Sequence, residues 1–312
     1  MQNYLVAMAV FAGLYALLAL GLNVVWGMTG MINLGLAGFF AVGAYVSALA
    51  SKNGGVPIAA GVAAAAVAAA AAGALLALTT ARLRGDYLAI ITLGFAEVVR
   101  LVASNELWLT NGTDGISGIP GPWRGRVPPT TFNALYLGIV ALTVAVIFLA
   151  CQRLRHSPYG RALRAIRDDD QVASVAGKAV IAFKVQAFAL SAAILGVAGA
   201  LWAHYTSFIA PEAFAPLVTI YIVLALTAGG TGNNVGALVG AVLVVFFMEA
   251  TRFATGWIGA LAPVQVAALR EALIGAGLLL VLRLRPHGLV PERIVRVAAP
   301  GPEHRASIGA SR

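Results

Sequence analysis

The sequence predicts an all-α fold, a polytopic bundle of transmembrane helices, and three observations support this class. Of the 312 residues, 60% are hydrophobic and only 11% are charged, whereas about 25% of an ordinary soluble domain is charged. Apolar runs close to the roughly 20 residues that a helix needs to cross a bilayer recur along the chain. No strand-like alternation of polar and apolar residues competes with these runs, so the spans are expected to be helical.

Eight apolar regions account for most of the chain. In chain order they are Leu5–Val25, Met31–Ala50, Pro57–Thr80, Tyr87–Ala103, Asn133–Cys151, Val185–Ala203, Leu217–Met248 and Ala267–Leu282. The seventh region is long enough for two segments and is interrupted by a polar, Gly-rich stretch, so we expect about eight to ten membrane segments with Gly-rich broken helices. The first region has no basic leader and no small-residue cleavage site, so it is not expected to be a removed signal peptide.

The basic residues predict the orientation of the spans. Of 21 Lys and Arg, seven lie in Arg153–Lys184 and six in Arg283–Arg312, and the positive-inside rule places both segments in the cytoplasm. Counting back puts 104–132 outside and 82–86 inside. A strict count then places the N-terminus outside, although a broken piece near Trp26–Gly35 would reverse it. We therefore expect a permease domain over 1–290 with a cytoplasmic loop at 153–184, and a flexible basic cytoplasmic tail over 291–312.

Two oppositely charged pairs fall within predicted spans. Glu97 and Arg100 are three residues apart, as are Glu249 and Arg252, so each pair would share a helix face and neutralise itself. All four residues lie near predicted span ends, where long side chains can reach the interface. We interpret them as structural ion pairs, with a proton relay or ion site as the alternative.

Catalytic, cofactor and metal motifs do not occur in the sequence. HExxH, GxSxG and the P-loop pattern GxxxxGK[ST] are all missing, so the chain is not expected to be an enzyme or to bind ATP in the Walker manner. His204 stands alone at a span end, and the single cysteine, Cys151, excludes a disulfide framework and a Cys-based metal cluster. No cofactor and no metal is predicted. The net charge of +9 is explained by topology and anionic lipid rather than by nucleic acid. These features favour a membrane protein that moves a solute.

Two Gly-x-Thr-Gly stretches interrupt the apolar sequence. Irregular backbone at membrane depth is tolerated only inside protein or beside a water-filled cavity, and broken helices in matching positions of two halves indicate a translocation path. Ordinary turns between spans are the alternative interpretation. The candidate path residues are Gly27, Thr29, Gly30, Asn33, Gly229, Gly230, Thr231 and Gly232.

The loop after the fifth apolar region predicts a short amphipathic helix. Ser157 is a favourable N-cap, and Pro158 suits the first helical position. Helical spacing places Tyr159, Ala162, Leu163 and Ile166 on one face, and Arg161, Arg164 and Asp168 on another. Such a helix can lie on anionic lipid or dock into a groove on a cytoplasmic partner. The acidic run Asp168–Asp170 argues against lipid alone, because an anionic surface would repel it.

Taken in order, these features resemble the permease subunits of branched-chain amino-acid ABC importers, of the LivM type. The resemblance covers roughly residues 10 to 290 and rests on Gly21–Gly30, Asn33–Gly35, Gly43–Tyr45, Leu83–Arg100, Asn111–Ile116 and Ser157–Arg167. Leu83–Arg100 is similar to the LivM-like branch rather than to its LivH-like sister. Two departures are Gly230–Asn233, where the family commonly has a Gly-Leu-Gly-Ser-like turn, and Asp168–Asp170, where a Glu-rich run is common.

The resemblance implies an ATP-driven importer for branched-chain or related hydrophobic amino acids in the bacterial cytoplasmic (inner) membrane. Such permeases work with a sister permease, two cytoplasmic ATPase subunits and a periplasmic solute-binding protein. The loop helix would meet an ATPase through Ser157, Tyr159, Gly160, Arg161, Leu163, Arg164, Ile166 and Asp168. A urea or short-amide permease of the same family stays open, because the binding protein sets much of the specificity. A stand-alone secondary transporter is a further alternative.

Overall fold

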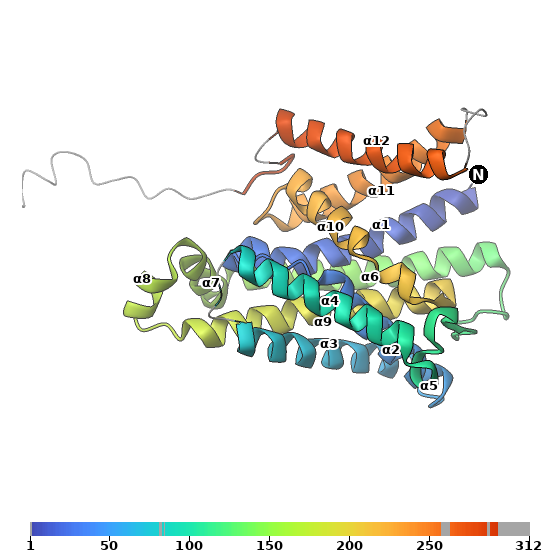
Figure 1. Ribbon diagram of the computed structural model, residues 1–312, viewed down its shortest axis with the longest axis horizontal. Helices are drawn as coiled ribbons and strands as arrows, with labels where there is room; N and C mark the ends of the chain where they lie inside the picture. The colour runs from blue at the N-terminus through green and yellow to red at the C-terminus, as the bar shows by residue number, and fades with distance from the viewer. Residues whose placement is uncertain (1, 81–82, 84, 257–262, 286–287, 293–312) are drawn as a thin grey trace, which may run out of the picture.

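The computed structural model describes residues 2–80, 83, 85–256, 263–285 and 288–292 of the chain. Long helices run side by side in a bundle (Figure 1), and the two strands of the described residues, β1 (Ile116–Ser117) and β2 (Phe208–Ile209), pair only with each other. Seven of the described helices are long and apolar enough to cross a membrane. The predicted all-α, polytopic fold class is therefore confirmed.

The first half of the bundle contains six α-helices and two shorter helical turns. They are α1 (Gln2–Leu22), the π-helical η1 (Asn23–Gly27), α2 (Leu36–Lys52), α3 (Ile58–Thr80), α4 (Asp86–Asn105), α5 (Leu107–Thr110), η2 (Gly112–Asp114) and α6 (Pro129–His156). The remaining elements are α7 (Pro158–Asp168), α8 (Asp170–Val175), α9 (Val180–Thr206), η3 (Pro211–Phe214), α10 (Pro216–Gly229), α11 (Asn234–Gly256) and α12 (Pro263–Leu284).

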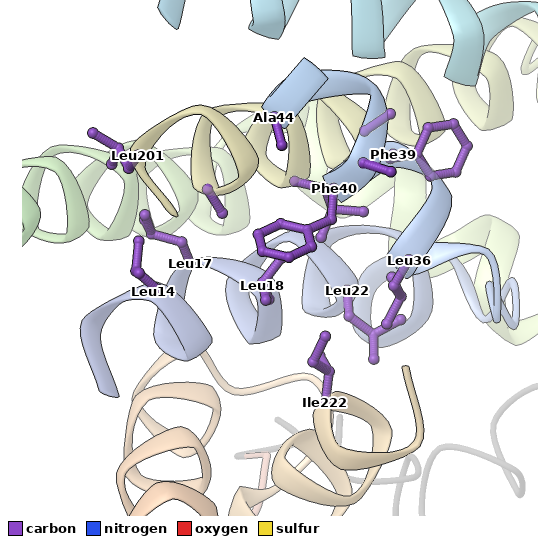
Figure 2. Close-up of a cluster of buried hydrophobic side chains, with 14 of the residues drawn as sticks. Leu14, Leu17, Leu18, Leu22, Leu36, Phe39, Phe40, Ala44, Leu201 and Ile222 are labelled. Atoms are coloured by element: carbon purple, nitrogen blue, oxygen red, sulfur yellow. The ribbon is translucent and has the colours of Figure 1, made fainter. Parts of the chain in front are cut away.

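Helix α9 lies at the centre, against α1, α2 and α3. Glycines allow this packing: a Cβ added to Gly43 of α2 would lie 2.2 Å from the carbonyl oxygen of Gly196, and one added to Gly199 would lie 2.0 Å from that of Phe40. Small residues at helix contacts let membrane helices approach closely. Beside this contact, leucine and phenylalanine side chains from α1, α2, α9 and α10 form the hydrophobic core (Figure 2).

The seven candidate spans are fewer than the eight to ten membrane segments that the sequence predicts. Two predicted spans are not among the seven: α2, which begins only at Leu36 and has 17 residues, and α12, several of whose side chains lie outside the described residues. Before α2, the chain is irregular and partly buried, and Leu34 N donates to Thr92 Oγ1 of α4 at 3.0 Å. In the first turn of α2, Ala37 N donates to Thr219 Oγ1 of α10 at 3.2 Å. Irregular backbone inside a membrane bundle needs such internal partners.

The two ends of the bundle carry different features. The N-terminus, α5 and the connection to α6 lie at one end, and α7 and α8 lie at the other (Figure 1). This arrangement agrees with the strict span count, in which the N-terminus and 104–132 share one side of the membrane and 153–184 occupies the other. Residues 293–312 of the predicted tail lie outside the described residues, as does the Arg252 side chain.

Candidate functional site

Helix α7 begins as the sequence predicts. The Ser157 hydroxyl accepts a hydrogen bond from Gly160 N at 3.1 Å, and Pro158 occupies the first helical turn. Gly160 lies close to the end of α6, because an added Cβ would be 2.1 Å from the Leu154 carbonyl oxygen. The cap and the glycine together fix the angle at which α7 leaves α6.

The apolar face of α7 is covered by the chain itself. Ala162, Leu163 and Ile166 are buried, Leu163 lies in a cluster with Met28 and Ala187, and the Tyr159 ring stacks on Phe183 with centroids 5.1 Å apart. Burial raises the pKa of the Tyr159 phenol, which keeps it neutral. The predicted face is correct, but neither lipid nor a partner's groove can receive it. It anchors α7 to η1 and α9.

A partner can therefore reach only the opposite side of α7, together with α8. Arg161 and Asp168 are exposed, whereas Arg164 is half-buried and donates to the Arg155 carbonyl oxygen at 3.0 Å. Helix α8 was missed in the sequence, although Asp169 is its N-cap and accepts from two backbone amides. Two apolar side chains on α8 are strongly exposed, Val172 at 64% and Val175 at 91%.

Arg167 connects α7 to the rest of the bundle. Its guanidinium donates to the Gly27 carbonyl oxygen in the first Gly-rich break. The same group pairs with Glu292, with Nη1 and Oε2 2.9 Å apart, and Arg155 lies 3.9 Å from the other Glu292 oxygen. The side chains of Glu292 and Arg155 are each only 14% exposed. Neither Arg167 nor Glu292 was among the predicted site residues.

Backbone hydrogen bonds from Leu289 and Val290 hold the segment that carries Glu292 against α10. Leu289 N donates to the Ala228 carbonyl oxygen at 2.9 Å, and Val290 N donates to that of Gly229 at 2.8 Å. These are carbonyls at the C-terminal end of α10, which otherwise lack partners in the helix. The segment after α12 thus covers the end of α10 and brings Glu292 to α7.

The two Gly-rich breaks meet at the α7 end of the bundle. Asn23 Nδ2 donates to Asn234 Oδ1 at 2.8 Å, and Gly232 N donates to Asn23 Oδ1 at 2.9 Å. Asn234 Nδ2 also donates to Gln152 Oε1 at 3.2 Å. Both asparagines are fully buried, and Gly27 is so close that an added Cβ would lie 2.8 Å from Gly232 N. We call the side chains of Asn23, Asn234 and Gln152 the amide junction.

The breaks differ in form. Gly230 to Asn233 form a tight turn between α10 and α11, with Thr231 exposed, so the turn interpretation describes this stretch. The first break passes through η1 into irregular, buried chain. There the Asn33 side chain is fully buried, its oxygen accepting from Gly35 N at 2.8 Å. The first break thus meets the structural requirement of a broken helix, and the second does not.

A polar cavity of about 390 Å³ joins the two groups of predicted residues. Its lining includes Thr29 and Gly30 from the first break and Ile166 and Asp168 from α7. Lys184 also lines it and pairs with Asp170 at 3.1 Å. Candidate coupling residues and candidate path residues therefore share one cavity at the α7 end.

The charged pair on α4 forms as predicted, at a different depth. Arg100 Nε donates to Glu97 Oε2 at 2.9 Å, but Glu97 is the twelfth residue of the 20-residue α4. The expectation that Glu97 lies near a span end is wrong, because eight residues of α4 follow it before the helix ends at Asn105. Glu249 accepts a hydrogen bond from the Tyr4 hydroxyl, and its predicted pairing with Arg252 falls outside the described side chains.

His204 has a structural role. Its side chain is fully buried, Nδ1 lies 2.6 Å from the Pro120 carbonyl oxygen, and Nε2 lies 2.8 Å from Ser47 Oγ. Among the described residues, no group of three His, Cys, Asp or Glu side chains could hold a metal ion.

Comparison with known proteins identifies the family. A family model described as branched-chain amino acid transport system / permease component matches residues 4–282. The chain belongs to this permease family. It is a multi-pass membrane permease and thus a component of a transport system, in agreement with its apolar helices.

Several named relatives are similar to this permease. The high-affinity branched-chain amino acid transport system permease protein LivM of Escherichia coli K12 is 34% identical over 92% of this chain and 70% of its own length. A probable LivM of Methanocaldococcus jannaschii is 30% identical over 70% of this chain and 64% of its own. The LivH permease protein of E. coli K12 is 27% identical over 74% of this chain and 79% of its own. No solved structure matches.

Proposed function

We propose that this permease is the membrane-spanning subunit of an ATP-driven importer for branched-chain or related hydrophobic amino acids. Its LivM and LivH relatives are named as permease proteins of branched-chain amino acid transport systems, which supports the substrate class. ATP would be hydrolysed on separate subunits, since the sequence has no P-loop. The proposed partners are a sister permease, two cytoplasmic ATPase subunits and a periplasmic solute-binding protein, assembled in the bacterial cytoplasmic membrane.

The observation that carries the coupling role is the connection from α7 to the first break. Leu163 and Ile166 fix α7 to the bundle, and Arg167 joins it to the Gly27 carbonyl oxygen. A displacement of α7 must therefore move η1, because interfaces packed this closely shift between discrete arrangements rather than deform continuously. The exposed valines of α8, with Arg161 and Asp168, form the surface offered to an ATPase.

The translocation path is proposed to pass beside the first break. Gly27 and Gly232 are in contact, and the amide junction holds η1, α6 and α11 together at this end. Movement of α7 through Arg167 would separate these contacts and open the way to the polar cavity at Thr29 and Gly30. The solute would leave at the α7 end of the bundle.

The test uses the complete importer in proteoliposomes, with binding protein outside and ATP inside. Val172→Asp combined with Val175→Asp places two charges on the α8 surface, and uptake should be lost while the permease stays in the membrane. Leu107→Asp is the matched control, because Leu107 is 72% exposed on α5 at the other end of the bundle. Normal uptake by the α8 variant would refute the coupling surface. Uptake by the purified chain alone, without ATP, would refute the importer.

A further inference from the structure

Helix α4 exposes a continuous stripe along its length. Its other face packs into the bundle through Leu88, Ala89, Thr92, Ala96 and Ala103. The exposed residues recur at helical spacing, so they share one face. This α4 face comprises the exposed Tyr87, Ile90, Gly94, Val98 and Leu101, with the half-exposed Glu97 among them.

The ion pair makes lipid an unsuitable cover for the α4 face. Glu97 and Arg100 keep 38% and 27% of their side chains exposed. Helix α4 is about 30 Å long, as thick as a hydrocarbon core, and Glu97 lies about 17 Å from its start, near the middle of the helix. Charged side chains at this depth almost always face the interior of a bundle or a water-filled cavity. In the single chain they face outwards.

A glycine lies beside the ion pair on the same face. Nothing in the described part of the chain comes within 4 Å of a Cβ added to Gly94, so no close contact there requires this glycine. Glycine on an exposed membrane helix permits the backbone of another helix to approach closely. Gly94 and Glu97 are one turn apart, which places a close-packing position next to a polar one.

We infer that the α4 face is the surface on which the sister permease packs, with Glu97 and Arg100 enclosed in the interface. This inference rests on the proposed function, in which two permeases form the membrane part. Relatives of both kinds support the choice of partner, because the LivM and LivH permease proteins of E. coli K12 are each similar to this chain. Polar groups of the sister permease would bond to the ion pair, since hydrogen bonds across helices stabilise membrane interfaces.

Helix α6 offers a matched control surface. Its exposed stripe contains Leu142, Val146 and Leu149 at 67%, 58% and 57% exposure. These residues are apolar and carry no charge, as expected of a lipid-facing surface. Gly138 on the same helix has as much open space around an added Cβ as Gly94, so the ion pair is what distinguishes the α4 face. Val146 has the same exposure as Val98 on α4, so the two positions differ in surroundings rather than in accessibility.

The test is photo-crosslinking in the assembled importer. A benzophenone-bearing amino acid replaces Val98, Ile90 or, as the control, Val146, and the complex is irradiated in membranes. The inference predicts that positions 98 and 90 give a product with the summed mass of the two permeases. Position 146 should give no such product. Crosslinking to a second copy of this chain, or a sister-permease product from position 146 alone, would overturn the named interface.

Failure of the inference can be told from failure of the proposed function. If the importer purifies intact and takes up amino acids, yet positions 98 and 90 give no product with the sister permease, only the α4 interface is wrong. If no second permease co-purifies and the chain alone transports solute, the proposed function is wrong and the interface falls with it.

Discussion

Replacing Glu292 by glutamine should loosen the segment that covers the end of α10. Glu292 accepts a hydrogen bond of 2.9 Å from Arg167, and its side chain is 14% exposed. A hydrogen bond to a charged group contributes about 1.5–3 kcal/mol. A loss of about 2 kcal/mol corresponds to about a 30-fold increase in the opening of the segment, because 1.4 kcal/mol is about tenfold.

Hydrogen exchange measures this opening directly. The amides of Leu289 and Val290 donate to α10 carbonyl oxygens, so they exchange only when the segment detaches. In lipid nanodiscs, Glu292→Gln should speed the exchange of these two amides by about 30-fold, because the charged hydrogen bond to Arg167 is lost. Exchange in the middle of α9, far from the segment in sequence, should not change.

Asp168 provides the matched control, because it pairs with the same arginine. Its oxygen lies 3.6 Å from Arg167 Nε, but its side chain is 74% exposed. Exposed ion pairs contribute about 0–1 kcal/mol, so Asp168→Asn should change exchange by less than about fivefold. Equal effects of the two variants, or unchanged exchange in Glu292→Gln, would refute the assignment of Glu292 as the residue that retains the segment.

Three further predictions concern the cap, a helix contact and the irregular chain. Ser157→Ala removes the N-cap and should destabilise α7 by about 0.5–2 kcal/mol. Hydrogen exchange of the amides in the first turn of α7 should become faster, and ATP-driven uptake should weaken. Unchanged exchange of these amides would contradict the role of Ser157 as the cap. Gly240→Val puts a side chain where a carbonyl oxygen of α10 lies 1.8 Å from an added Cβ, so no monodisperse peak is expected in gel filtration. Gly138→Val faces open space and should give a normal peak. Thr92→Val leaves the half-buried Leu34 amide without its acceptor, at about 1–3 kcal/mol, and should lower the thermal midpoint, whereas Thr92→Ser should not.

Much of the fold could be predicted because its signals are local. The predicted span Pro57–Thr80 and the observed α3 (Ile58–Thr80) differ by only one residue. They agree because a lipid-facing helix must be apolar along its whole length, which the sequence shows directly. Helix α7 could be predicted because Ser157 and Pro158 are start signals and its periodicity shows which face is buried. Neither prediction needs information from elsewhere in the chain.

The remainder depends on partners far away in sequence. The Gly-rich stretch and Asn33 indicate a break between Trp26 and Gly35, but the sequence does not show that the hydroxyls of Thr92 and Thr219, far along the chain, accept hydrogen bonds from Leu34 and Ala37 there. Arg167 and Glu292 are 125 positions apart, and no periodicity connects them. The cover of the α7 apolar face was likewise not predictable, because the pattern shows that a face is buried and not against what.

The amide junction has a consequence for energetics across a charged membrane. Moving one elementary charge through the membrane potential changes its energy by about 2.3 kcal/mol per 100 mV. Asn23, Asn234 and Gln152 are neutral at every physiological pH and can exchange their bonds for bonds to water. Parting them transfers no charge and no proton, so the three amides add no dependence on voltage or acidity; any such dependence must come from the charged groups that move with α7, such as Arg167 and Glu292. The opening of the amide junction is therefore controlled by the movement of α7.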